Sequence, residues 1–344
     1  MIDAGAEGPL RCFPRFAPDQ RRWQPTQRAI VDPVTTLADI RAAADRIRGH
    51  VHRTPVLTSA TLDRELGAQV FAKCENLQKV GAFKARGACN AVFALDDAAA
   101  RRGVVTHSSG NHGAALAYAA AKRGIACTVV MPDTAPRVKI DAVRGYGAEV
   151  VLCKASERDA VSARLQQERN ATMVHPFENP FVIAGQGTAA LELLEDVADL
   201  DVVITPVGGG GLCAGTAVAV RALRPAMMLL GAEPKAVDDA ARSLATGVRQ
   251  PRVENAKSWG DGLMTGLGEP NFRLLQQHRV RIVTVDEPAM VEGSLFFLQR
   301  MKIVVEPSSA TVLAALRAIA PELRGKRVAM ILTGGNTDFA WLPR

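Results

Sequence analysis

Residues 201–220, DVVITPVGGGGLCAGTAVAV, place a strand, a glycine run and a helix in one continuous stretch. The β-branched residues of 201–207 are typical of a buried strand, and 213–225 space small and apolar side chains as a helix does. Between them lies the run Gly208–Gly211. Four consecutive glycines cost conformational entropy on folding, so their presence indicates that some group must approach the backbone closely. The junction therefore predicts a loop and a helix N-terminus that bind an anion such as a phosphate. The alternative interpretation is a tight turn that binds no ligand.

Two kinds of phosphate ligand fit this loop. It could hold the phosphate of a small cofactor, or it could belong to a dinucleotide site. Gly209, Gly211 and Ala214 match the relaxed dinucleotide fingerprint, and Glu233 ends the next strand about 20 residues on, where a ribose-binding acid would lie. A single match of this type is weak evidence, and it falls in the second half of the chain. The choice depends on the other motifs.

The same alternation of strand and helix runs along most of the chain. Strands are expected at residues 103–109, 126–132, 149–153, 172–176, 201–207, 227–233, 281–287 and 327–335. Helices are expected at 37–50, 111–124, 137–147, 157–170, 187–200, 213–225, 288–302 and 308–321. Such a pattern predicts an α/β fold with parallel sheets covered by helices on both faces. Ligands of these sheets bind at the carboxyl ends of the strands.

Composition narrows the class of protein. The 344 residues are 48% hydrophobic and 22% charged, as in globular proteins of one large or two smaller domains. The net charge of +7 is spread without basic runs and aromatic residues are only 5%, so no nucleic-acid partner is expected. No apolar stretch approaches the ~20 residues of a membrane helix, so no membrane partner is expected either. Six separated cysteines suit reduced thiols, and the first residues lack the apolar core of a secretory signal. We expect a soluble cytoplasmic protein.

Two further segments carry chemistry. ENLQKVGAFKARGA, residues 75–88, puts Lys84 beside an aromatic residue in a glycine-flanked setting. A lysine that forms a Schiff base needs a confined site that favours its neutral amine. Taken alone, Lys84 is more readily explained as a solvated surface lysine. THSSGNHG, residues 106–113, follows a strand and opens a helix. Its Ser, Asn and backbone N–H groups suit a carboxylate, or simply cap the helix.

These three segments, in this order, resemble the serine/threonine dehydratase and serine racemase family of fold-type II pyridoxal-phosphate enzymes. The resemblance extends from about Thr36 to Asp338. It rests on residues 107–113, 182–188 (VIAGQGT), 206–211, 306–308 (EPS) and 333–336 (TGGN). It implies a tryptophan synthase β-like fold with two domains, each built on a parallel-rich twisted sheet flanked by helices. We expect a flexible extension at 1–34, a large domain at 35–98 and 177–344, and a small domain at 99–176.

The resemblance implies a set of cofactor contacts for pyridoxal 5′-phosphate. Lys84 would carry the cofactor as a Schiff base, Phe83 would pack against its ring, and Asn111 would bond its 3′-oxygen. Thr333 would meet the pyridine nitrogen, and Gly262 would line the other side of the ring. The phosphate would be held by the backbone N–H groups of Gly208, Gly209, Gly210, Gly211 and Leu212.

The resemblance also implies a substrate loop. Its residues, Ser108, Ser109, Gly110, Asn111 and His112, would hold the carboxylate of an amino acid. Ser109 matches the residue that faces the cofactor opposite the lysine in the racemases of this family. We therefore predict Lys84 and Ser109 as the catalytic residues.

A metal site is implied next to the sheet. Relatives use carboxylates at the positions of Glu233 and Asp239 with a backbone carbonyl at Val237, and oxygen ligands suit Mg²⁺ or Ca²⁺. A helix N-terminus whose acids complement the dipole is the alternative.

The function implied is a dehydratase, or ammonia-lyase, acting on L-threonine, L-serine or a related β-hydroxy-α-amino acid. Removal of the α-proton and loss of the β-hydroxyl would give a 2-oxo acid and ammonia. Serine racemase and 3-hydroxyaspartate ammonia-lyase are the alternatives on the same scaffold, and an NAD-binding oxidoreductase is a remote one. A homodimer is expected from the resemblance alone.

Overall fold

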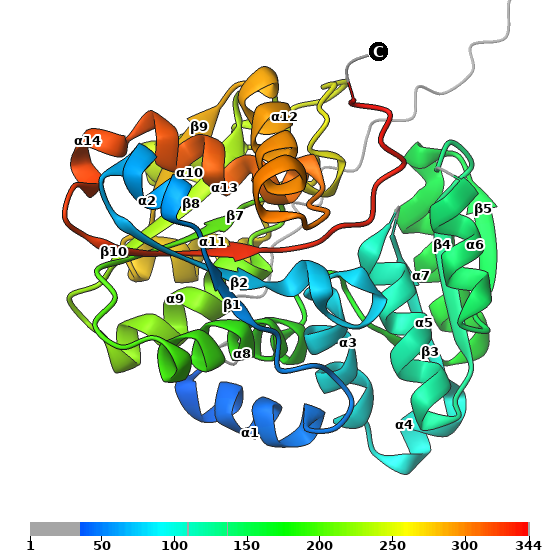
Figure 1. Cartoon of the computed structure of the whole chain (residues 1–344). Coiled ribbons are helices and arrows are strands. Elements are labelled where there is room, and N and C mark those ends of the chain that lie inside the picture. Colours follow the sequence, from blue (N-terminus) through cyan, green and yellow to red (C-terminus); the bar gives the residue numbers. More distant parts are fainter. Residues whose placement is uncertain (1–34, 109, 136, 343–344) are drawn as a thin grey trace, which may run out of the picture. The chain divides into compact units, whose positions relative to one another are not determined.

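The computed structural model describes residues 35–108, 110–135 and 137–342. The predicted extension at 1–34 and the predicted catalytic Ser109 lie outside the described residues. Two sheets organise the described chain (Figure 1). This confirms the α/β class with parallel-rich sheets that the alternating pattern predicted.

The larger sheet has six strands in the order β1-β2-β10-β7-β8-β9. Their bounds are β1 (Val56–Thr58), β2 (Gln69–Cys74), β7 (Val202–Pro206), β8 (Met228–Pro234), β9 (Arg281–Val285) and β10 (Arg327–Leu332). Strand β1 pairs antiparallel with β2, and the other neighbours are parallel. Neither β1 nor β2 was predicted: β1 has only three residues, and β2 (QVFAKC) includes the polar residues Gln69 and Lys73 in its short run.

The smaller sheet has four parallel strands in the order β5-β4-β3-β6. They are β3 (Val104–His107), β4 (Cys127–Pro132), β5 (Glu149–Cys153) and β6 (Thr172–Met173). The helices that connect them are α5 (Asn111–Arg123), α6 (Arg137–Gly145) and α7 (Arg158–Arg169). All four strands were predicted, within a few residues at their ends.

The larger sheet is buried on both faces, as a parallel sheet must be. Strand β10 shows this by alternation. Ala329 and Ile331 join the core beneath the helices of one face, whereas Val328, Met330 and Leu332 join the core of the other. The first face is covered by α1 (Leu37–Ile47), α8 (Pro180–Asp196), α9 (Gly211–Leu223) and α11 (Glu269–Gln277). The second is covered by α2 (Ala60–Leu66), α12 (Glu287–Phe296) and α13 (Pro307–Ala318).

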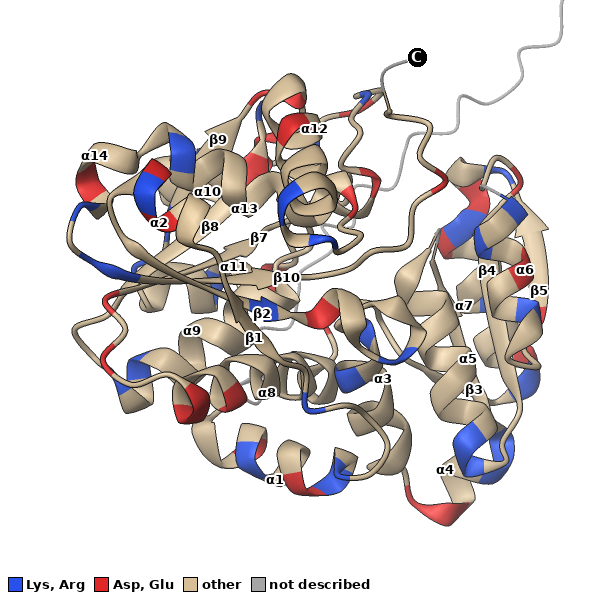
Figure 2. Cartoon of the chain, in the orientation of Figure 1, with Lys and Arg blue, Asp and Glu red and all other residues tan. Residues whose placement is uncertain are grey.

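The remaining helical elements connect these layers. They are η1 (Glu75–Leu77), η2 (Lys79–Gly81), α3 (Lys84–Phe93), α4 (Asp97–Arg102), η3 (Ala155–Glu157), η4 (Lys235–Val237), α10 (Asp239–Thr246), η5 (Asp261–Leu263), η6 (Phe297–Met301) and α14 (Ala320–Leu323). Basic and acidic residues are interspersed along the outer helices in the view of Figure 2. No helix among the described residues is long and apolar enough to cross a membrane.

Two helix boundaries differ from the predictions. Helix α8 begins at Pro180 rather than at residue 187, because Asn179 caps it through the N–H groups of Phe181 and Val182. The segment predicted as one helix at 288–302 is an α-helix to Phe296 and then a π-helical turn. The periodicity of apolar residues predicts neither feature, because a cap and a π-helical turn depend on local hydrogen bonds.

Candidate active site

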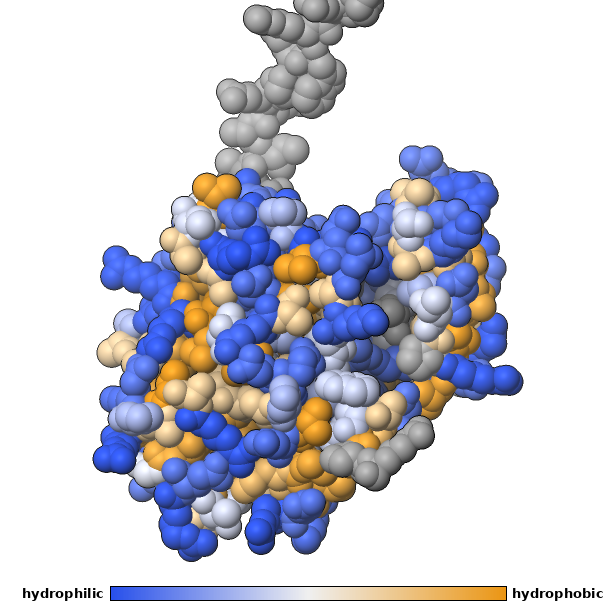
Figure 3. Space-filling model, turned by 90° about the horizontal axis from the view of Figure 1, so that it is seen from above, coloured by the Kyte–Doolittle hydropathy of each residue, from blue (hydrophilic) through white to orange (hydrophobic). Residues whose placement is uncertain are grey.

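One pocket collects the carboxyl ends of strands from both sheets. Its walls come from the loop after β3, the loop after β7, the first turn of α3 and the residue after β10. Viewed from above, the surface is hollowed between the regions formed by the two sheets (Figure 3). The described residues predicted for the cofactor and the substrate loop, from Phe83 to Thr333, all line this pocket. This is the position that parallel α/β sheets favour for ligands.

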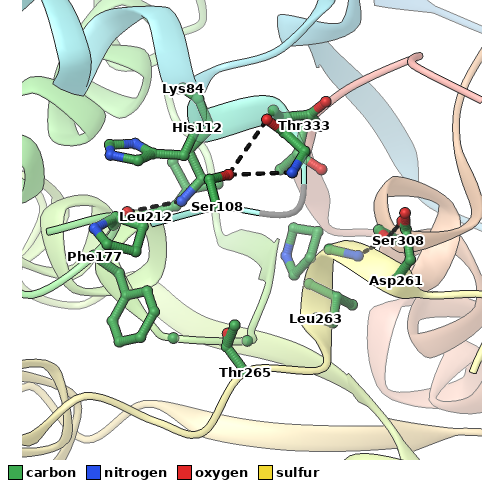
Figure 4. Close-up of a pocket in the computed structure, with 18 of the residues that line it drawn as sticks. Lys84, Ser108, His112, Phe177, Leu212, Asp261, Leu263, Thr265, Ser308 and Thr333 are labelled. Atoms are coloured by element: carbon green, nitrogen blue, oxygen red, sulfur yellow. Dashed lines mark hydrogen bonds between the residues drawn. The ribbon is translucent and has the colours of Figure 1, made fainter. Parts of the chain in front are cut away.

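Lys84 is the first residue of α3 and points into the pocket (Figure 4). Its Nζ donates to the Pro176 carbonyl at 2.8 Å and lies 5.2 Å from the centre of the Phe83 ring. The residue keeps some exposure to the pocket, but protein surrounds the amine, and this desolvation lowers the pKa of Lys84 to about 8. The amine therefore loses its proton more easily than an ordinary lysine does, as a nucleophile or base requires.

The glycine run leaves a set of backbone donors free. Gly210 has φ +86° and precedes α9 without a side-chain cap. Within the described chain, none of the N–H groups of Gly208, Gly209, Gly210, Gly211 and Leu212 has a hydrogen-bond acceptor. These groups line the same pocket as Lys84 and open a thirteen-residue helix. The donor set fits a phosphate, and no carboxylate of the described chain competes for it.

The glycine identities have a second cause that the sequence did not reveal. A Cβ on Gly209 would lie 2.3 Å from the ring of Phe177, and one on Gly208 would lie 2.9 Å from the Cα of Leu263. The loop is therefore compressed by protein on one side while its N–H groups remain free. Close approach was predicted correctly, but part of it comes from packing rather than from a ligand.

We expect Gly209→Ala to lose about 1–3 kcal/mol of stability, because the added methyl overpacks against Phe177. The loop must shift, so the protein should also retain less pyridoxal phosphate after dialysis. Thermal unfolding and the bound cofactor per chain measure the two effects. Gly145→Ala is the matched control, since nothing lies within 4 Å of its added methyl. Full stability and full cofactor in Gly209→Ala would contradict the packing argument.

The loop after β3 holds two polar side chains, those of Ser108 and His112, at the N-terminus of α5. The Ser108 hydroxyl accepts from the Gly110 N–H at 3.1 Å, and Gly110 caps the helix without a side-chain bond. His112 Nε2 bonds the Val174 carbonyl at 3.1 Å, so that nitrogen carries the proton. Burial, and then the charge of Lys84, hold the pKa of His112 well below its ordinary range. His112 is thus a neutral imidazole that is hydrogen-bonded to the Val174 carbonyl. Its contact with a substrate carboxylate remains a prediction.

Asn111 is held at both ends of its amide. Its Nδ2 donates to Glu306 Oε1 at 3.0 Å, and its Oδ1 accepts from Asn336 Nδ2 at 2.9 Å. An amide nitrogen carries two N–H groups, and one remains for a ligand oxygen. The predicted bond from Asn111 to a cofactor oxygen is compatible with this orientation.

Thr333 and Gly262 both line the pocket, and Thr333 is labelled in Figure 4. The Thr333 N–H donates to Ser309 Oγ at 2.7 Å and its carbonyl accepts from Phe83 at 3.0 Å, so the backbone is fixed and the hydroxyl is left to the pocket. Gly262 is held by its N–H bond to Ser308 Oγ at 3.0 Å. No role was predicted for Ser309, whose hydroxyl orients Thr333.

Several charged residues of the pocket were missed by the sequence patterns. Lys139 from α6 pairs with Asp261 from η5 across the pocket, and Arg158 comes from the start of α7. His107 also lines it, and burial lowers the pKa of His107 to about 4, with Arg158 the next cause. Lys139 and Arg158 lie in no recognisable motif, so only the three-dimensional fold places them at this pocket. His107, in contrast, belongs to the segment at 106–113.

The predicted metal ligands lie apart from this pocket. Glu233 is buried and accepts the N–H groups of Ala240 and Ala241 at 2.9 and 2.8 Å, while Asp239 accepts that of Leu267 at 2.8 Å. Burial raises the pKa of Glu233 to about 8. Among the described residues, no group of three or more His, Cys, Asp or Glu is arranged to hold a metal. Both carboxylates here accept backbone N–H groups, of helix α10 and of Leu267. The Mg²⁺ or Ca²⁺ site remains a prediction.

The fold and the pocket define an α/β enzyme in which a phosphate-binding loop shares a pocket with a buried lysine. A family model described as "Pyridoxal-phosphate dependent enzyme" matches residues 47–334. The chain therefore belongs to the pyridoxal-phosphate dependent enzyme family, and its fold is that of the fold-type II enzymes. This membership favours the cofactor-phosphate interpretation of the glycine run over the dinucleotide one.

Named relatives and solved structures agree with this assignment. The chain is 45% identical to a serine racemase of Dictyostelium discoideum, over 89% of this chain and 96% of that one. It is 45% identical to a beta-hydroxyaspartate dehydratase of Paracoccus denitrificans, covering 90% and 99%. The crystal structure of the Dictyostelium serine racemase superimposes with a TM-score of 0.85, covering 89% and 100%. That of a threonine deaminase from T.th. gives 0.84 at 44% identity, covering 89% and 99%.

Proposed function

We propose that this chain is a pyridoxal-phosphate dependent ammonia-lyase that converts a β-hydroxy-α-amino acid to a 2-oxo acid and ammonia. The observation that carries the proposal is the single pocket in which the Lys84 amine, the free N–H groups of Gly208–Leu212 and the Ser108–Asn111 loop converge. When bound, the cofactor supplies an electron sink for the carbon that loses its proton.

The residues divide the work as follows in this proposal. The N–H groups of Gly208–Leu212 would hold the phosphate, Asn111 would donate to the 3′-oxygen, and the Thr333 hydroxyl would meet the ring nitrogen. Phe83 and Gly262, which line the same pocket, would contact the ring. Lys84 would anchor the cofactor, and its free amine would take the α-proton of the substrate.

The substrate carboxylate is assigned to the loop after β3. The residues are Ser108, Ser109, Gly110, Asn111 and His112, and the N-terminus of α5 adds its dipole. We assign the movement that closes this loop over the substrate to a small domain at 99–176, which contains the whole four-stranded sheet. The rest of the described chain then forms the large domain.

Among the expected substrates, the pocket favours the dicarboxylate 3-hydroxyaspartate over threonine or serine. Arg158 lines the pocket and pairs with Asp159 through Nε at 3.1 Å, while its two Nη atoms make no hydrogen bond to the described residues. A planar guanidinium with two free nitrogens suits a second carboxylate. His107 also lines the pocket, burial lowers its pKa to about 4, and its buried Nδ1 has no hydrogen-bond partner among the described residues.

We expect Arg158→Met to raise the KM for 3-hydroxyaspartate by about 10–100-fold, because a charge-assisted pair is worth about 1.5–3 kcal/mol. The KM for L-serine, which has no second carboxylate, should change by less than about threefold. Arg164→Met, on the exposed side of the same helix, is the control. If the KM values for both substrates rise by the same factor, Arg158 does not bind the second carboxylate.

The experiment that tests the activity is a 2-oxo-acid and ammonia assay over L-serine, L-threonine and the isomers of 3-hydroxyaspartate. Turnover of none of them would refute the proposal. Chiral analysis of residual serine tests racemization, which the similarity to serine racemases supports and which Ser109 would serve as the second acid–base group. Runs with and without Mg²⁺ test the predicted metal. A cytoplasmic location and a homodimer complete the proposal, and light scattering measures the second.

A further inference from the structure

One buried acid in the pocket has no part in the roles assigned above. Glu306 stands just before α13, is 4% exposed, and lines the same pocket as Lys84. Its Oε1 accepts the bond from Asn111, whereas its Oε2 is buried and has no partner among the described residues. An unpaired carboxylate oxygen in such a place is costly unless it carries a proton.

The surroundings of Glu306 keep it neutral. Burial is the first cause that raises the pKa of Glu306 to about 8, and the nearby charge of Asp261 is the second. Lys139 and the Asn111 amide act in the opposite sense without overcoming them. At neutral pH the group is a carboxylic acid, and the proton belongs on the free Oε2, since Oε1 accepts from Asn111.

The carboxyl also has a route to solvent. A second pocket lies against the first, and Lys139, Asp261 and Glu306 line both. Its other walls include Trp259 and Trp341, and the Trp259 side chain is partly exposed. A proton given up inside the first pocket can therefore be replaced by water from the second.

We infer that Glu306 is the acid that protonates the departing β-oxygen of the substrate and is recharged through the second pocket. This rests on the proposed function. As the Cβ–O bond breaks, its electron pair stays on oxygen, which takes the proton from Oε2 and leaves as water. The pair of the broken Cα–H bond forms the Cα–Cβ double bond, and the α-proton remains on Lys84. Glu306, now a carboxylate, regains a proton from water.

Gly334 packs directly against the contact between Glu306 and Asn111. A Cβ there would lie 2.5 Å from Glu306 Oε1 and 3.3 Å from Asn111 Nδ2. Only glycine leaves room for the carboxyl and the amide to meet. The acid is thus placed by backbone geometry on one side and by Asn111 on the other.

The test compares leaving groups in the cofactor-loaded enzyme. Hydroxide leaves only with a proton, whereas chloride leaves without one, so L-serine needs the acid and β-chloro-L-alanine does not. Glu306→Gln keeps an acceptor for Asn111 and removes the acid. We expect its kcat to fall about 100-fold for L-serine and by less than about threefold for β-chloro-L-alanine. An equal fall for both substrates, or no fall, overturns the inference.

Asn336→Ala is the matched control. It removes the other bond to Asn111 and leaves Glu306 in place. We expect it to slow both substrates by the same factor, because it disturbs position rather than proton supply. If the parent enzyme releases ammonia from neither substrate, the proposed function fails, and that outcome is distinct from a failure of Glu306.

A measurement on the parent enzyme keeps the inference testable if Glu306→Gln does not fold. The acid form is present below the raised pKa and is lost as the pH rises through about 8. The serine-to-chloroalanine ratio of kcat should therefore fall above about pH 8, while Lys84 affects both substrates alike. A constant ratio overturns the inference. In the cofactor-free Glu233→Gln variant, which lacks the other carboxyl with a pKa of about 8, the infrared band of a protonated carboxyl should disappear over the same range.

Discussion

Lys84→Ala should turn over β-hydroxy amino acids at least about 10³-fold more slowly than the parent, because one substitution removes both the cofactor anchor and the base. The structure places the Lys84 amine inside the pocket with a pKa lowered to about 8 by burial. The variant should still fold, since the Lys84 amine makes one hydrogen bond to the described residues, to the Pro176 carbonyl. Ammonia release under saturating substrate is the measurement.

A covalent readout separates anchoring from general damage. Borohydride reduction of the loaded parent should fix one cofactor to the peptide that contains residue 84, as mass spectrometry detects, and Lys84→Ala should carry none. Lys122→Ala is the control, because Lys122 lies exposed on α5, away from the pocket. A cofactor still fixed in Lys84→Ala, or turnover near the parent rate, would contradict the assignment.

The parts of the site that the sequence predicted are those encoded locally. The glycine run and the loop at residues 106–113 each join a strand to a helix within a dozen residues, so their position at a strand's carboxyl end follows from the pattern. Lys84 is a different case. Its burial depends on contact with Pro176, which is distant in sequence, and only the ordered set of motifs indicated it.

The residues that were missed reach the pocket through tertiary structure alone. Arg158 and Lys139 begin or lie within helices of the smaller sheet, where a basic residue is ordinarily solvent-exposed. Glu306 lies in the EPS segment at 306–308, which contributes to the resemblance. Its unpartnered oxygen becomes apparent only when α5 and the turn at Gly334 pack around it.

The helix that carries Lys84 is anchored by a buried set of ions. Arg86, two residues on, is fully buried and forms paired bonds of 2.7 and 2.8 Å to both carboxylate oxygens of Glu75. It forms two more, of 2.7 Å, to Glu192 on α8. Lys73 on β2 completes the set with a bond of 2.7 Å to Glu192. Lys73 Nζ also lies 3.7 Å from Asp196 Oδ2, so Arg86 and Lys73 share the carboxylates of Glu75, Glu192 and Asp196.

Arg86→Met should cost about 3–5 kcal/mol of folding free energy, because it leaves Glu75 without its cation and Glu192 with only one. Urea unfolding of the cofactor-free and the loaded protein measures the loss. Arg53→Met is the matched control. Arg53 also pairs with two carboxylates, those of Glu195 and Asp196, but its side chain is 52% exposed, so its removal should cost at most about 1 kcal/mol.

The pH dependence of this loss follows from the carboxylates that Arg86 pairs with. Burial alone would raise the pKa of Glu192, but the bonds from Arg86 and Lys73 hold it below its ordinary value. A carboxyl with a lowered pKa contributes stability above its unfolded pKa, and that contribution is lost as the pH falls through the folded one. The gap between parent and Arg86→Met should therefore narrow below about pH 4, where the parent loses the stability that the paired Glu192 carboxylate contributes. A gap that stays constant to about pH 3, or a loss no larger than that of Arg53→Met, would show that Arg86 acts through packing and not through its charge.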